Sequence, residues 1–150
     1  MIMDMARRDE DYDDDEPQPI FSAITPGRCV ELLSTQSIGR VAWQAPDGLQ
    51  ILPVTYVFSD GRIVFRTSPD SVLSELSSLS DVVFEVDEID QRNHRGWSVV
   101  ARGQAQAVAE PRELDRLLTD AGVVPWAPGD RNMVIEITPR KMTGRTVSAR

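Results

Sequence analysis

Three polar residues stand together where a predicted strand meets a predicted helix. Arg66, Thr67 and Ser68 follow an apolar stretch, and Pro69 comes directly after them. A serine followed by a proline is typical of a helix N-cap and the first helical residue. We therefore expect a helix to begin at Pro69, which places an arginine, two hydroxyls and a helix N-terminus at one strand end. Such donors suit a phosphate or another anion. The alternative is an ordinary capped helix beside a surface arginine.

A predicted hairpin positions this group. Residues 49–58 and 62–67 are rich in β-branched and aromatic side chains, and Ser59-Asp60-Gly61 separates them. Asp-Gly between two apolar runs is among the strongest hairpin signals in a sequence. The second strand of this hairpin ends at the polar group.

The rest of the chain alternates short strands with short helices. Predicted strands cover 38–43, 82–86, 97–108 and 132–138, with a continuation of the last to 147 left open. Helices are expected to begin at Thr25-Pro26 and at Pro111, and the helix expected from Pro69 has its apolar face at Val72, Leu73, Leu76 and Leu79. Small residues alternate along 97–108, which suits a strand on the inside of a small barrel. No glycine-rich loop joins a strand to a crossover helix, so a Rossmann site is not expected. The pattern favours a mainly β antiparallel barrel.

Composition excludes several functions. The 150-residue chain has one cysteine, Cys29, and one histidine, His94, which leaves almost no ligands for a zinc site. Cys29 lies in the apolar pattern of a helix and is expected to be a buried structural thiol, and His94 is expected in a solvated loop. The lone cysteine fits a reducing cytoplasm, and neither a secretory signal nor a membrane span is recognised.

Most of the negative charge lies in one segment. Residues 4–16 hold eight acidic residues and two arginines, which accounts for −6 of the chain's net charge of −8. We expect residues 1–19 to be an acidic disordered tail and residues 20–150 to form the folded domain. The folded part has no basic stripe, so no nucleic-acid partner is expected.

Five strings in order resemble the pyridoxamine 5′-phosphate oxidase-like family. They are ELLSTQSIGRVAW, ILPVTYVFSDGRIVFRTS, VVFEVDEID, RGWSVVARGQAQAV and PRKMTGR. The resemblance covers about Pro26 to Val147. It implies a six-stranded antiparallel split β-barrel of Greek-key type with short flanking helices. It also implies a homodimer that binds FMN in grooves across the subunit interface.

The resemblance assigns a cofactor role to particular residues. The strand that it places along the flavin ring edge, through backbone contacts, carries Pro53, Val54, Thr55 and Tyr56. The residues that it places around the flavin phosphate are Arg66, Thr67, Ser68 and Ser71. Ser98 matches a polar position that contacts the flavin. Because Trp97 and Ser98 alternate across one strand, only one of them can face the groove. Trp97 is expected to be either a flavin contact or an anchor in the core or the interface. Trp126 is expected either to cover the flavin from a loop or to be an exposed apolar side chain.

The sequence also departs from the family pattern. Many relatives carry an Arg-Lys cluster after the strand end, whereas the matching stretch here is Pro69-Asp70-Ser71-Val72, which has no lysine and an added acid. Arg66 is then the main cation for the phosphate, with Arg40, Arg102 and Arg145 as further candidates. The substrate-binding positions of true pyridoxamine phosphate oxidases are not recognisable, which argues against pyridoxine metabolism.

Two functions remain open at this stage. The first is a flavin- or deazaflavin-dependent reductase or oxidase of a small molecule, with no catalytic side chain identified. The second is a non-catalytic flavin-binding, storage or sensing dimer, or a family member that has lost its cofactor.

Overall fold

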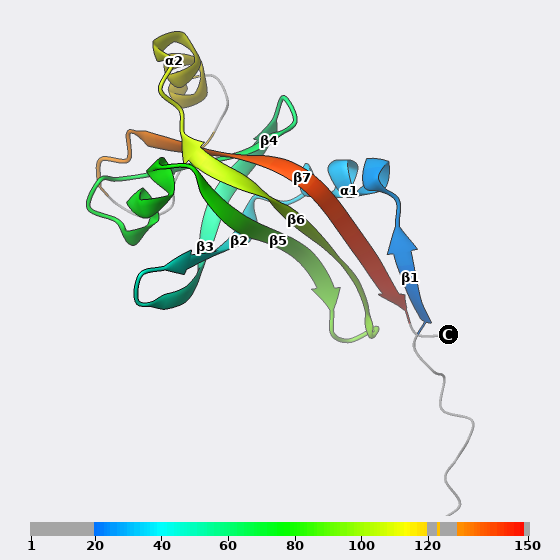
Figure 1. Ribbon diagram of the computed structural model, residues 1–150. Coiled ribbons are helices and arrows are strands. Elements are labelled where there is room, and N and C mark those ends of the chain that lie inside the picture. Colours follow the sequence, from blue (N-terminus) through cyan, green and yellow to red (C-terminus); the bar gives the residue numbers. More distant parts are fainter. Residues whose placement is uncertain (1–19, 120–122, 124–128, 149–150) are drawn as a thin grey trace, which may run out of the picture.

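A computed structural model describes residues 20–119, 123 and 129–148 (Figure 1). The acidic tail over residues 1–19 and Trp126, for which the sequence makes predictions, lie outside the described residues. In the described part of the chain no helix is long and apolar enough to cross a membrane.

The described chain is mainly β. In order it contains β1 (Ile20–Ile24), α1 (Pro26–Leu33), β2 (Ile38–Ala45), β3 (Gly48–Ser59), β4 (Arg62–Thr67), the 3₁₀ helix η1 (Val72–Ser77), β5 (Ser80–Asp90), β6 (Arg95–Ala107), α2 (Pro111–Thr119) and β7 (Met133–Ser148). The predicted strands are all present, and most are longer than the sequence indicated. β1 was not predicted.

Six of the strands form a closed antiparallel ring. Its order is β7-β4-β3-β2-β5-β6, and pairing between β6 and β7 closes it. β1 pairs with the far end of β7, outside the ring. In Figure 1, α2 lies at the end of the molecule opposite the β5–β6 hairpin. The six-stranded antiparallel split barrel with short flanking helices is confirmed.

Alternate residues of each strand fill the barrel. Along β6, Val99, Ala101 and Ala105 are fully buried, and Trp97 packs against the same core. Small side chains there leave room for larger ones from the facing strands, such as Phe65. Cys29 is buried in this core, which confirms the prediction of a structural thiol, and burial raises the pKa of its thiol.

Local sequence signals set most of the element ends. Asp60 and Gly61 have φ angles of 51° and 75°, so both central residues of the β3–β4 turn adopt the left-handed conformation that a tight hairpin requires. The Thr25 hydroxyl accepts a hydrogen bond from the Arg28 backbone N–H at 3.3 Å and caps α1 as expected. His94 is exposed in the β5–β6 turn, as predicted.

The predicted helix start at Pro69 is wrong. Ser68 to Ser71 form a turn closed by a hydrogen bond from the Ser71 N–H to the Ser68 carbonyl at 3.1 Å. Proline is favoured at the second position of such a turn as well as at the start of a helix, so the dipeptide fits both structures. The helix, a short 3₁₀ helix, begins three residues later and has Ser71 as its N-cap.

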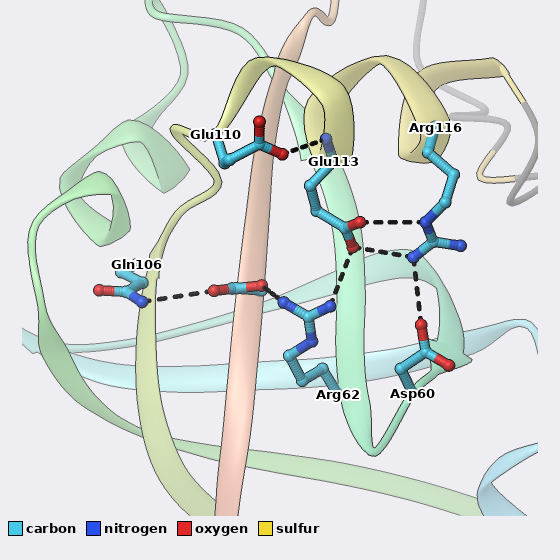
Figure 2. Close-up of polar contacts among 7 residues, drawn as sticks. Asp60, Arg62, Gln106, Glu110, Glu113 and Arg116 are labelled. Atoms are coloured by element: carbon cyan, nitrogen blue, oxygen red, sulfur yellow. Dashed lines mark hydrogen bonds and ion pairs between the residues drawn. The ribbon is translucent and has the colours of Figure 1, made fainter.

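A polar network attaches α2 to the barrel wall (Figure 2). Glu113 of α2 accepts hydrogen bonds from Arg116 at 2.8 and 3.0 Å and from Arg62 of β4 at 2.9 Å. Arg62 also pairs with Glu136 of β7, whose other oxygen accepts from Gln106 at 3.3 Å. Glu136 is only 8% exposed. Its carboxylate therefore depends on Arg62 for charge compensation.

We predict that Arg62→Met destabilises the fold by about 2–3 kcal/mol, because it leaves the buried Glu136 carboxylate without its cation. Adding Glu136→Gln to that variant should restore part of the loss, since it removes the unpaired charge. Urea unfolding of the wild type and the three variants, including Glu136→Gln alone, measures both effects. If the double variant were less stable than Arg62→Met, the buried charge would not be the cause.

The same network makes the stability of the fold depend on pH. Hydrogen bonds from Arg116, and then from Arg62, lower the pKa of Glu113 to about 2 from an ordinary value of 4.5. Because the folded state has the lower pKa, this contribution is present above about pH 4.5 and is lost as the pH falls toward 2. In the unfolding series, the stability difference between the wild type and Glu113→Gln should therefore shrink over that range.

Candidate functional site

The barrel wall is split between β3 and β4. The two strands pair only through Tyr56–Ser59 and Arg62–Phe65. Before Tyr56, β3 pairs with β2 over Gly48–Thr55, and beyond Phe65, β4 pairs with β7. One side of the β3 backbone from Gly48 to Thr55 thus has no strand partner among the described residues. Unpaired backbone donors and acceptors are available there to bind a ligand.

The β3 residues that are predicted to contact a flavin alternate between the outer face and the inside of the barrel. Pro53 and Thr55 lie on the outer face, whereas Val54 and Tyr56 are buried in the barrel. The Tyr56 hydroxyl donates to the Leu33 carbonyl at 2.5 Å, and burial raises the pKa of that phenol. The Val54 and Tyr56 side chains are therefore not available to a ligand, and the Tyr56 backbone N–H already donates to the Ser37 carbonyl at 2.9 Å.

Arg66 and Thr67 point to opposite faces of β4. Thr67 shares the barrel-facing side with Phe65 and is fully buried, and its hydroxyl has no hydrogen-bond partner among the described residues. Arg66 lies on the other side. It donates to the Arg131 carbonyl at 2.8 Å and to the Val123 carbonyl at 3.3 Å. Strand alternation, which the predicted cluster did not take into account, keeps the two side chains from converging.

The two serines of the predicted anion site are close in sequence but have different surroundings. Ser71 caps η1 by accepting from the Leu73 N–H at 3.2 Å. Ser68 lines a pocket of about 500 Å³ together with Asp70 and Asp130. Two carboxylates in this pocket oppose an anion beside Ser68.

Trp97 and Ser98 lie on opposite faces of β6. Trp97 packs against the barrel core, which matches the core-anchor alternative. Ser98 is opposite Arg145 of β7 in the strand register, and both line a small pocket of about 120 Å³ whose lining also includes Phe21 and Trp97. The polar residue is therefore the one on the outer face.

Arg40 is not a free compensating cation. It pairs with Glu85 across the outer face at 3.3 Å. Burial and the neighbouring Asp87 raise the pKa of Glu85, while Arg40 lowers it, with a net upward shift. Within the described residues, no group of three or more His, Cys, Asp or Glu side chains could hold a metal ion.

Comparisons with known proteins agree with this architecture. The family described as pyridoxamine 5′-phosphate oxidase matches residues 25–146. The chain belongs to this family. An uncharacterised protein of Mycobacterium tuberculosis, Rv0080, is 31% identical over 125 residues, which is 80% of this chain and 81% of that protein.

Two solved structures share the fold. One is a Corynebacterium glutamicum protein provisionally named pyridoxamine 5′-phosphate oxidase. It is 28% identical, with a TM-score of 0.72 over 87% of this chain and 95% of that one. The other is an FAD-binding protein of Mycobacterium smegmatis. It is 24% identical, with a TM-score of 0.70 over 85% of this chain and 98% of that one.

Sequence reasoning missed features of this family member that depend on distant residues. The Arg62–Glu113–Glu136 network joins three elements, and neither acid stands out in its local sequence. An irregularity between β6 and β7 was also missed, although Gly103 inside an otherwise regular strand is a signal for one.

We predict that Thr67→Val leaves the flavin-free protein as stable as the wild type or about 1 kcal/mol more stable, because it removes a buried hydroxyl that has no partner. Urea unfolding without added flavin measures this. Thr55→Val on the outer face is the matched control and should change little. A loss of more than 1 kcal/mol in Thr67→Val would mean that the hydroxyl is hydrogen-bonded in the free protein.

Proposed function

We propose that this protein binds FMN at the split between β3 and β4 and uses it as a flavin-dependent oxidoreductase acting on a small molecule. The observations that carry the proposal are the open β3 backbone and the buried, unpartnered hydroxyl of Thr67 at the end of β4. Family membership and the flavin-binding relative support it. A deazaflavin is the alternative cofactor.

The residues present fit such a group in two respects. A buried hydroxyl without a partner is costly unless a ligand satisfies it, and Thr67 lies at the strand end where the family resemblance puts the flavin phosphate. The unpaired β3 backbone next to Pro53 and Thr55 supplies N–H and C=O groups of the kind that hydrogen-bond the edge of a flavin ring. Bound flavin supplies hydride transfer, and the protein supplies position and electrostatics.

Arg66 is the cation whose hydrogen-bond partners would change most when the flavin phosphate binds. It now donates to two backbone carbonyls, which are neutral acceptors. A phosphate would compete for it with full negative charge, and charge-assisted hydrogen bonds are the stronger ones. Asp70 weakens the local field, so we propose modest affinity for the phosphate.

We also propose that the protein is a homodimer. Trp97 and Val99 do not provide apolar surface for a dimer, because Val99 is fully buried and Trp97 packs on the core of its own barrel. The exposed apolar side chains are elsewhere: Leu49 and Ile51 on the outer face of β3 are 82% and 63% exposed. A second copy covering them would bury apolar surface beside the split.

We predict that wild-type protein takes up added FMN and becomes yellow, and that Arg66→Ala weakens FMN about ten- to a hundredfold. Riboflavin has no phosphate, so it should bind the wild type poorly and respond little to the substitution. Quenching of flavin fluorescence measures both ligands.

Equal weakening of FMN and riboflavin by Arg66→Ala would make Arg66 a structural residue and refute the phosphate assignment. Protein that stays colourless with FMN and with a deazaflavin would contradict the cofactor proposal itself.

We predict that Ile51→Glu shifts the protein from dimer to monomer in light scattering, because the proposed interface would then bury a carboxylate. Leu79→Glu is the matched control: Leu79 is also 63% exposed but lies on the link between η1 and β5, and its substitution should leave the mass unchanged. A wild-type protein that is monomeric at all concentrations would exclude the dimer.

A further inference from the structure

Another pocket lies on the outer face of the barrel and includes Leu49 of the open part of β3. Its volume is about 500 Å³, which is within the range of small-molecule sites. Most of its lining comes from β2, β5 and β6, which lie side by side in the sheet (Figure 1). Ala42 and Val83 give it an apolar floor, and Leu49, which also belongs to the proposed dimer surface, lines it as well.

Two arginines, Arg102 of β6 and Arg140 of β7, line the same pocket. Both are exposed, and neither makes an ion pair or a side-chain hydrogen bond within the described residues. The pocket has one carboxylate, Asp81, and Gln104 donates to it at 3.2 Å. Two cations against one acid, above an apolar floor, leave the pocket net positive.

An irregularity in the pairing of β6 with β7 brings these two arginines to the same pocket. In the β6–β7 register, Arg102 is opposite Lys141 and Gly103 is opposite Pro139, so Arg140 is an extra residue without a partner. Such a bulge redirects side chains. Glycine is required here, because a β-carbon at Gly103 would lie 2.1 Å from the Thr138 carbonyl oxygen. Gly103 thus permits the strand approach that brings Arg140 to the pocket.

We infer that this pocket binds an organic anion with a flat apolar body, such as an aromatic carboxylate or phosphate ester. The apolar body would lie over Ala42 and Val83, and the anionic group would pair with Arg102 and Arg140. Arginine suits this task because its planar guanidinium binds carboxylate and phosphate oxygens in pairs. The inference does not rest on the flavin proposal, because the two arginines lie on β6 and β7 and Leu49 is the one lining residue from the open part of β3.

The test is calorimetric titration of the full chain with three probes that share one ring system. They are 1-naphthyl phosphate, 1-naphthoate and the neutral 1-naphthol. Both anions should bind with one site per chain, and the neutral probe should bind at least about tenfold more weakly, as expected for the loss of a charge-assisted contact. The ratio of the two anions distinguishes a phosphate site from a carboxylate site.

Two kinds of variant locate the binding. Arg102→Ala combined with Arg140→Ala should weaken the anions at least about tenfold and leave 1-naphthol unchanged. Val83→Glu should also weaken the anions, because Val83 is directly opposite Arg102 in the register and its replacement puts a carboxylate there. Arg112→Ala is the matched control, an exposed arginine of α2 outside the pocket, and should change nothing.

Other outcomes overturn the inference. If saturating FMN displaced 1-naphthyl phosphate, the pocket would be part of the flavin site. If the double arginine variant changed the mass in light scattering without changing anion binding, a second copy of the chain would be the occupant. Equal binding of 1-naphthol and the anions would leave the arginines without a role in recognition.

Discussion

Closure of the sheet through β7 is the constraint on which the rest of this structure depends. On one edge β7 pairs with β6, and on the other it pairs first with β4 and then with β1. The short β3–β4 pairing completes the ring without covering the whole of β3. Closure therefore gives a packed barrel, and the incomplete pairing gives the split. A longer β4 would have extended the ladder along β3 and removed the candidate cofactor site.

Local signals in the sequence were sufficient for most of the fold. Asp60-Gly61, the Thr25 cap and the alternation along β6 each depend on residues within a few positions of one another. These are short-range rules, and the structure follows them. The start of η1 could not be predicted in this way, because Ser68-Pro69 suits a turn and a helix equally well. Packing of Leu73 and Leu76 into the core decides between the turn and the helix at this point, and this tertiary contact cannot be predicted from the local sequence.

The site was harder to predict than the fold for a related reason. A sequence motif groups residues that are adjacent in the chain, whereas a strand separates adjacent side chains onto opposite faces. Arg66 and Thr67 illustrate this: one is held by loop carbonyls and the other points into the barrel. Partners such as Arg62 and Glu136 are 74 positions apart and meet only because β4 and β7 are neighbours.

The open edge of β3 also bears on how the protein avoids aggregation. An unpaired, apolar strand edge invites a strand from another chain, and runs of such additions lead to insoluble fibres. Pro53 lies within this edge and has no N–H to donate, which is why proline is found at strand edges and why it interrupts a foreign ladder. The edge can thus remain accessible to a small flat molecule while resisting the extended peptides that would otherwise join the sheet.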